Sequence, residues 1–544
     1  MTQSGQNRGY LHGAAILAMA VAIVKIIGAV FRIFLGNIIG DAGMSIFTIA
    51  HNIYAFLLAL SSAGLPIALS KMVASADALG RPRQVEQVFF VARNTFLTLG
   101  IISFLIMAVF HQQLAALSQS PSAAYGILAL SPSMLFVCLL SAYRGYFQGH
   151  SNMIPTSVSQ VIETIPRLVL GLGLSWYLLQ QGYSLAIAVA GSILGITAGT
   201  AISCAYLFFA KRKAKHKVEK KALLDTPDTN RRILRNLLNI AVPLTLGVSM
   251  FSIVNIIDAA IILRRLQDAL GYTYQMAQRL HGTYGMTMSL FNLPSSFIIP
   301  LTMALIPAIS AFLARGDALS ARRTSESGLR MTCLIALPAG VGLTVLAEPI
   351  MQVLYYGRFA AQGPGLLAYM GIAAFFICLF QATNCVLQAY GFQRYSIYTL
   401  PVGGLIKLVF NWFLLADPRF GIYGAAISTV ICYAAISIIN MILVKWRIPN
   451  SPSFIKAFTK PFLCTIVMGV TAWASYGLLH RMTFAIIGDV ALPHRILLAL
   501  PLGGAIVLAM GAYLILVIVM RAITIEDMKM LPRGEKLAKI LRVR

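Results

Sequence analysis

Residues 14–36 read AAILAMAVAIVKIIGAVFRIFLG, an apolar run long enough to cross a bilayer as one helix. Crossing the hydrocarbon takes about 20 apolar residues. We expect a full span rather than a cleavable signal peptide, because no small-residue cleavage site is apparent in the run. Two cations, Lys25 and Arg32, interrupt it. The stretch therefore indicates a membrane protein that carries charge inside a span.

The rest of the 544-residue chain has the same character: 58% of its residues are hydrophobic, 11% are charged, and the mean hydropathy is +0.79. Soluble domains carry about 25% charged residues. The apolar runs are too long, and alternate too little, for barrel strands of roughly 10 residues. We predict an all-α integral membrane protein with about fourteen spans. They lie at 14–36, 44–70, 88–110, 122–146, 154–179, 184–210, 234–263, 283–314, 327–350, 362–390, 395–416, 421–445, 456–479 and 492–520.

Spans one to six and seven to twelve look like two copies of one unit. Gln148 precedes Arg167 by nineteen residues, and Gln388 precedes Lys407 by the same distance. With six spans each, the copies share one orientation, as in transporters built from parallel repeats. The predicted division is an N-terminal lobe (1–210), a basic cytoplasmic linker (211–233), a C-terminal lobe (234–447), two additional spans (448–520) and a basic cytoplasmic tail (521–544).

The net charge of +26 does not indicate nucleic-acid binding, because the positions of the Lys and Arg residues follow the predicted membrane topology. With the N-terminus in the cytoplasm, 32 of the 43 Lys and Arg residues lie in or beside cytoplasmic segments, and 7 lie in the opposite connections. This is the positive-inside pattern. The cluster KRKAKHKVEKK at 211–221 is then a topology determinant that also touches anionic lipid, the alternative being regulation or partner binding.

A cysteine placed at Lys217 tests this orientation. In an otherwise cysteine-free version, we expect it to resist an impermeant thiol reagent in intact cells and to react after lysis. Labelling in intact cells would reverse the predicted topology.

The seven cysteines stand singly in spans without a CxxC pair, so we predict reduced apolar fillers and no metal centre or cofactor. They are Cys138, Cys204, Cys333, Cys378, Cys385, Cys432 and Cys464.

Polar residues inside spans form stripes on single helix faces. A charge at mid-membrane costs about 2.5–3.5 kcal/mol on insertion scales, so such residues need a function or a partner. An aqueous cavity between two lobes would have these stripes, although amides can also hold helices together by hydrogen bonds. The stripes are Lys25 and Arg32; Gln160, Glu163 and Arg167; Ser252, Asn255 and Asp258; Gln381, Asn384 and Gln388; and Lys407 and Asn411.

The sign of these stripes favours an anionic substrate. Lys25, Arg32, Arg167 and Lys407 outnumber the acids Glu163 and Asp258, and Glu163 can pair with Arg167 four residues later. Phosphate oxygens match the geometry of a guanidinium. Three further arginines form a predicted basic cluster at the outer connection: Arg264, Arg265 and Arg279.

Two stretches resemble the SpoVB and YtgP branch of the oligosaccharide-lipid flippases. They are GAVFRIFLGNIIGDAGMSIFTIAHNIYAFLLALSSAGLPIALSKMV (28–73) and RGYFQGHSNMIPTSVSQVIETIPRLVLGLGL (144–174), and NIIDAAIILRRLQ (255–267) is similar to its seventh span. The resemblance implies the MurJ-like fold, with two six-helix lobes in a V around a cationic cavity plus two extra helices. It also implies export of lipid II, the undecaprenyl-diphosphate-linked peptidoglycan precursor.

Residue correspondence with the family is partial. Lys25 stands where MurJ-type proteins carry a cavity arginine, and Arg32 lies near the second one. Asp41 lies earlier than the acid that follows in that branch, and Arg279 could replace an arginine expected inside span eight. Arg32-Ile-Phe-Leu replaces the usual Arg-Ile-Pro-Leu.

The predicted function is therefore a lipid II flippase of the bacterial cytoplasmic membrane. Its partners would be the anionic lipid-linked oligosaccharide, membrane lipids and cell-wall synthesis proteins. A flippase for another polyprenyl-linked polysaccharide unit is the first alternative, and a MATE-type drug exporter, which should have an acidic cavity, is the second. A membrane enzyme is disfavoured, because the chain lacks an Asp-x-Asp motif, a histidine cluster and any loop longer than roughly 25 residues.

Overall fold

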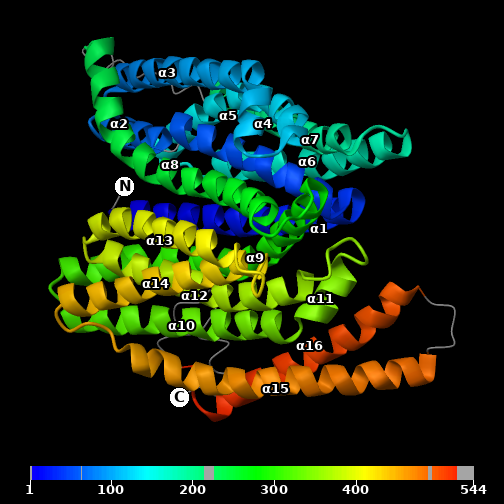
Figure 1. Cartoon of the computed structure of the whole chain (residues 1–544). Coiled ribbons are helices and arrows are strands. Elements are labelled where there is room, and N and C mark those ends of the chain that lie inside the picture. Colours follow the sequence, from blue (N-terminus) through cyan, green and yellow to red (C-terminus); the bar gives the residue numbers. More distant parts are fainter. Residues whose placement is uncertain (1–2, 63, 214–225, 488–492, 524–544) are drawn as a thin grey trace. The chain divides into compact units, whose positions relative to one another are not determined.

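A computed structural model describes residues 3–62, 64–213, 226–487 and 493–523. Within these ranges the regular structure is helical, with no strand, as predicted. The first helices are α1 (Gln3–Ser62), α2 (Leu65–Ala78), α3 (Pro82–Val109), α4 (His111–Leu117), a 3-10 turn (Pro121–Ala123), α5 (Ala124–Gly149), α6 (Ile154–Gln180) and α7 (Leu185–Lys213). They are followed by α8 (Asn230–Asp268), α9 (Tyr274–Ala314), α10 (Ala318–Val345), α11 (Ala347–Leu354), α12 (Gly363–Ala389), α13 (Gln393–Leu414), α14 (Tyr423–Arg447), α15 (Phe454–Ile487) and α16 (His494–Val519) (Figure 1).

Twelve of the described segments are long and apolar enough to span a membrane. The first of them, Met19–Ala78, is 60 residues long, which is enough for two crossings at about 20 residues each. The 39-residue α8, predicted as the seventh span, is long enough to cross but is not among the twelve. The chain is thus a multi-pass helical membrane protein with roughly the predicted number of helices.

Gly40 divides α1 where the sequence predicted the break between the first two spans. Its φ of 67° and ψ of −171° are not helical, so two arms, 3–39 and 41–62, meet at this residue. A positive φ costs glycine little because it has no Cβ. The chain therefore redirects here without a loop.

The turns after α5 and α12 have the same hydrogen-bonding pattern. After α5, the N–H groups of residues 151 and 152 donate to the carbonyls of residues 148 and 147. After α12, the N–H groups of residues 391 and 392 donate to the carbonyls of residues 388 and 387. Ser151 and Gly391 both have positive φ. These helix ends are related by 240 residues, the offset that also relates Arg167 to Lys407; the internal repeat stays a prediction.

Two short helices, α4 and α11, were not predicted from the sequence. α4 follows α3 after one residue, and α11 follows α10 after one residue. Each stands at the corresponding point of its copy, against α5 and α12 respectively. With seven and eight residues they are too short to cross a membrane; α4 falls in a predicted loop, and α11 begins within the predicted span 327–350.

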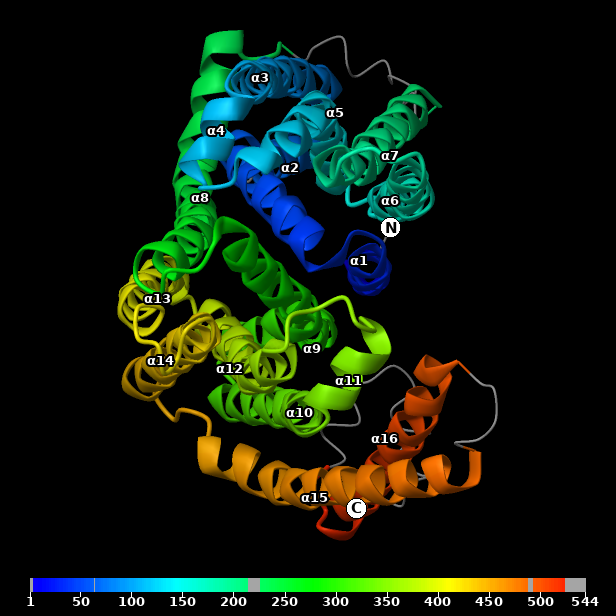
Figure 2. The ribbon, with the colours of Figure 1, turned by 45° about the vertical axis from the view of Figure 1, so that its right-hand side comes forward.

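The chain separates into two compact units, Met1–Arg264 and Arg265–Arg544. In the first, α5 contacts α3 and α7, and α6 contacts α7 and α1; in the second, α12 contacts α9, α10 and α14 (Figure 2). The N-terminal part of α8 contributes Ile233, Leu237 and Ala241 to the core of the first unit. The lobes that the sequence defines by repeat, with α8 opening the second, stay a prediction.

The two additional helices pack within the second unit. α15 and α16 lie against each other, and α15 also contacts α10 (Figures 1 and 2). Tyr513 of α16 donates a hydrogen bond to the Leu334 carbonyl of α10 at 2.9 Å. All seven cysteines are buried, as expected for apolar fillers.

Glycines allow α6 and α7 to approach closely. Gly199 of α7 faces the main-chain oxygen of Glu163, and Gly195 packs on Gly171. Small residues at such contacts let membrane helices meet backbone to backbone. This contact fixes the part of α6 that carries Glu163.

Gly199→Ala tests that contact, because its new Cβ would overlap the Glu163 carbonyl oxygen. We expect a loss of about 1–3 kcal/mol, typical of overpacking, and a lower unfolding temperature of the purified protein. Gly173→Ala on α6 is the matched control, since its Cβ would meet nothing within 4 Å. Equal unfolding temperatures for the two variants would contradict the close packing.

Candidate functional site

Arg32 lies near the bend of α1 and reaches the second arm of that helix. Its guanidinium carbon is 5.9 Å from the ring centroid of Phe47, within the range of a cation–π contact. Phe47 stacks in turn on His51, with ring planes 5° apart. The bend therefore brings a cation of the first arm over an aromatic row of the second.

Glu163 on α6 bridges two arginines. Its Oε2 lies 2.9 Å from Arg144 Nη2 on α5, and its Oε1 lies 3.7 Å from Arg167 Nη2 one turn further along α6. Arg144 Nε also donates to Ser159 Oγ at 3.0 Å. The three charged side chains are 18%, 16% and 23% exposed for Arg144, Glu163 and Arg167. One carboxylate thus faces two guanidiniums, and the group carries a net positive charge.

The predicted Glu163–Arg167 pair is present, but it is not the closest contact of the acid. The sequence analysis did not single out Arg144, whose contact with Glu163 is shorter by 0.8 Å. The acid is therefore shared, and Arg167 is less neutralised than an isolated pair would be.

Three buried polar atoms in this region have no hydrogen-bond partner among the described residues: Arg167 Nε, Gln160 Oε1 and His51 Nδ1. Leaving a buried donor or acceptor unsatisfied costs about 1–3 kcal/mol. Arg32 and Arg167 both lie within electrostatic range of the His51 ring. Arg32 and Arg167 are thus brought near a histidine that the sequence did not assign, and Glu163 and Gln160 lie one and two turns before Arg167 on α6.

Lys25 and Asp41 lie at the edges of this region. Lys25 is exposed on the first arm of α1 and remains within electrostatic range of Arg32. Asp41 follows the bend and is buried, and its Oδ1 accepts from the Ala42 N–H at 2.7 Å. The Asp41 side chain therefore hydrogen-bonds to the main chain directly after the bend.

Asn255 and Asp258 belong to α8 of the same unit. The main-chain oxygen of Asn255 accepts a long hydrogen bond, 3.5 Å, from Asn52 Nδ2 of α1. Asp258 is buried and has interactions of its own. The Asn52 side chain thus ties α1 to the main chain of α8, which is the helix-joining role left open for polar residues in spans.

The second unit holds Lys407 in the position that corresponds to Arg167. Lys407 and Asn411 on α13 are both buried, and Asn411 accepts a hydrogen bond from Ser428 of α14. The buried His281 of α9 lies within electrostatic range of Lys407. Gly403 occupies the place of Glu163 in this copy, so the bridging acid has no counterpart four residues before Lys407.

The three predicted outer arginines have separate surroundings. Arg265 lies 3.8 Å from the ring centroid of Trp412 on α13 and donates from Nε to the Trp412 carbonyl at 3.1 Å. Arg264 and Arg279 are exposed, and each has contacts of its own. For Arg265 the geometry indicates a fixed structural contact.

No three His, Cys, Asp or Glu side chains are grouped for a metal ion in the described ranges. The chemistry that the first-unit cluster offers is the binding of negatively charged oxygens by guanidinium, imidazole and amide groups.

A family model described as "Polysaccharide biosynthesis protein" matches residues 10–313, and a model described as "MatE" matches residues 278–413. The chain is 25% identical over 529 residues to "Stage V sporulation protein B" of Bacillus subtilis (strain 168), covering 96% of this chain and 98% of that protein. It is 24% identical over 526 residues to "Lipid II flippase MurJ" of the same organism, covering 92% and 94%.

Solved structures share the fold at low sequence identity. "Lipid II flippase MurJ, inward closed conformation" matches with a TM-score of 0.65 at 14% identity, over 93% of this chain and 98% of that chain. A multidrug resistance MATE family transporter of the MOP superfamily in an inward-facing conformation gives 0.65 at 15% identity, over 80% and 98%. The relatives whose names state an activity are transporters or flippases, and the resemblance to SpoVB and MurJ proteins is confirmed. The chain therefore belongs to the polysaccharide biosynthesis protein family and has the fold of the MurJ and MATE transporters of the MOP superfamily.

Proposed function

We propose that this protein is a flippase that exports lipid II from the inner to the outer leaflet of the bacterial cytoplasmic membrane by alternating access. The observation that carries the proposal is the partly buried cationic cluster of the first unit. Arg144 and Arg167 share one acid, and Arg167 keeps a buried N–H without an acceptor. Such a site suits the diphosphate of a lipid-linked sugar, since arginine binds phosphate oxygens through directed hydrogen bonds.

The sign of the cluster separates this proposal from drug export. A transporter of cationic compounds needs uncompensated carboxylates in its cavity, whereas Glu163 is engaged by two arginines. The MATE-like fold alone does not decide the substrate, because one fold hosts different functions.

In the proposed cycle the diphosphate contacts Arg32 and Arg167, and Lys25 attracts it along the first arm of α1. The polyprenyl tail stays in lipid. An anion at mid-membrane feels the potential, worth about 2.3 kcal/mol per charge per 100 mV across the full thickness. An inside-negative potential would thus favour outward movement of the bound anion, or inward return of the empty cationic cavity. Cell-wall synthesis proteins would be the partners that receive the product.

The runner-up is a flippase for another polyprenyl-linked polysaccharide unit, favoured by the family description. Both substrates share the diphosphate, so the site would bind either one through the same contacts.

Complementation decides among these functions. The chain is expressed in bacteria depleted of their lipid II flippases, and lipid II is measured in each leaflet. Restored growth with lipid II in the outer leaflet is expected. Rescue only of a strain lacking a capsule-unit flippase would favour the runner-up, and resistance to cationic drugs without either rescue would refute an anionic substrate.

A further inference from the structure

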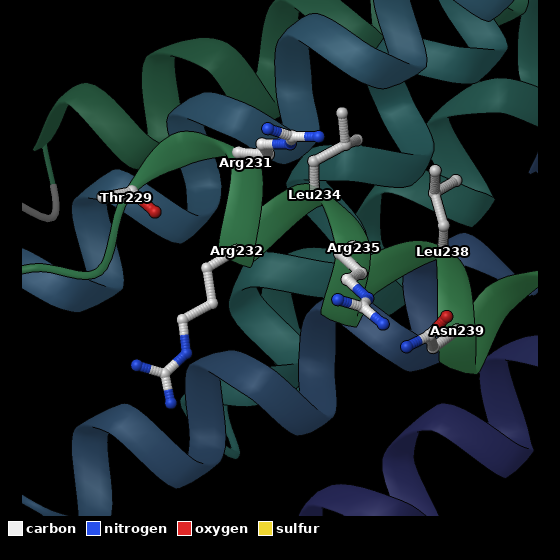
Figure 3. A pocket seen from close by; sticks show the side chains of 7 residues that line it. All are labelled: Thr229, Arg231, Arg232, Leu234, Arg235, Leu238 and Asn239. Carbon is white, nitrogen blue, oxygen red and sulfur yellow. The ribbon is translucent and has the colours of Figure 1, made fainter.

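The N-terminal turns of α8 have two different faces. One face is built into the core of the first unit through Ile233, Leu237 and Ala241. The other lines a pocket of about 640 Å³ (Figure 3). The lining residues are Thr229, Arg231, Arg232, Leu234, Arg235, Leu238 and Asn239.

Two of the three arginines that line the pocket have no hydrogen-bond or ion-pair partner among the described residues. Arg231 and Arg235 are four residues apart, so they lie on one face of the helix, and both are exposed. Neither makes a hydrogen bond or ion pair within the part of the chain that the structure describes. Arg232, in contrast, pairs with Asp228 at 3.4 Å.

Apolar side chains continue the same surface toward the membrane-crossing part of α8. Leu234 and Leu238 line the pocket beside the arginines, and Val242 follows one turn later, 47% exposed. Cationic groups followed by an apolar strip match a molecule that has an anionic head and a hydrocarbon tail. A free nucleotide or inorganic phosphate would not use the leucines.

The position of the pocket agrees with such a ligand. Asn230 begins α8, so the positive end of the helix dipole adds to the potential at the pocket. The basic segment 211–221 precedes it in the sequence, and the positive-inside pattern predicts the cytoplasmic side of the membrane for both. The cytoplasmic leaflet carries anionic phospholipid.

We propose that this pocket is a binding site for an anionic phospholipid, whose phosphate contacts Arg231 and Arg235 and whose acyl chain lies along Leu234, Leu238 and Val242. The bound lipid holds the start of α8 at the membrane surface. It thereby stabilises the folded state, because it binds that state alone.

Native mass spectrometry of the full-length protein in neutral detergent, titrated with phosphatidylglycerol or phosphatidylcholine, tests the site. The wild type should retain phosphatidylglycerol preferentially. The double variant R231A/R235A should bind it about 30-fold more weakly, since each cation near an anionic membrane contributes about fivefold. R231K/R235K, which keeps both charges without the bidentate geometry, should fall between the two.

The matched control is K71A/R83A, which removes two exposed cations from α2 and α3 of the same unit. It should change phosphatidylglycerol binding less than twofold. An equal loss in both double variants would reduce the effect to general charge and overturn the site. Displacement of the lipid by an equal concentration of inorganic phosphate would also overturn it, because a soluble anion would then be the ligand. The unfolding temperature of R231A/R235A without added lipid should match the wild type, since neither arginine has a hydrogen-bond or ion-pair partner among the described residues.

Discussion

Glu163→Gln should lower the free energy of unfolding by about 1–3 kcal/mol, because it removes hydrogen bonds to charged groups that are only partly buried. The substitution leaves the guanidiniums of Arg144 and Arg167 facing each other without an acid, with less than a quarter of each side chain exposed. The measurement is the unfolding midpoint of the purified protein, together with its abundance in the membrane. Glu86→Gln is the control: Glu86 pairs with Lys211 at 2.8 Å but is 59% exposed, so the loss there should stay below about 1 kcal/mol.

The partner that rescues Glu163→Gln identifies the stronger contact. Adding Arg144→Gln should recover more stability than adding Arg167→Gln, because Arg144 lies 2.9 Å from the acid and Arg167 lies 3.7 Å away. From the sequence alone, a charge swap of Glu163 and Arg167 would be expected to restore function in part. In the structure, an arginine at position 163 would place a second cation beside Arg144, so we expect the swapped protein to remain impaired. A double-mutant cycle in which the Arg167 coupling equals or exceeds the Arg144 coupling would contradict this arrangement.

The contact of Glu163 with Arg167 is predictable from the sequence, whereas its contact with Arg144 is not. Glu163 and Arg167 are neighbours on one helix, and a spacing of four residues predicts their contact without a structure. Arg144 meets Glu163 only because α5 and α6 turn back on each other after residue 149. Arg144 lies five residues before the end of α5 and Glu163 nine residues after the start of α6, so equal spacing about the turn does not predict their contact.

The fold was more predictable than the site. Hydropathy located the spans because each run must match the thickness of the bilayer, and the break at Gly40 falls between two predicted spans. The short helices α4 and α11 were missed since their length carries no such constraint. His51 was missed because its relation to Arg32 and Arg167 depends on the bend of α1 and on packing, which periodicity does not encode.

Replacing Arg167 with Ala should reduce transport at least tenfold while the folded protein remains abundant. Glu163 would keep its closer partner Arg144, so no buried acid is left uncompensated. The buried Nε without a partner would disappear with the side chain. A hydrogen bond to a charged group contributes about 1.5–3 kcal/mol, or roughly tenfold to a hundredfold in affinity for the diphosphate. Arg93→Ala on α3 is the control, since its guanidinium contacts Phe90 and Asn94 rather than the cluster.

The same assay extends to the cations of α1. Arg32→Ala should also reduce transport, because Arg32 approaches His51 from the first arm of the helix. Lys25→Arg keeps the positive charge and should be tolerated, whereas Lys25→Glu would repel the diphosphate and should abolish transport. Complementation of a flippase-depleted strain, with immunoblots to correct for abundance, provides the measurement. If Lys25→Glu, Arg32→Ala and Arg167→Ala all complement fully at normal abundance, the cationic cluster does not bind the substrate. The sign of its charge would then give no reason to choose an anionic lipid over any other cargo.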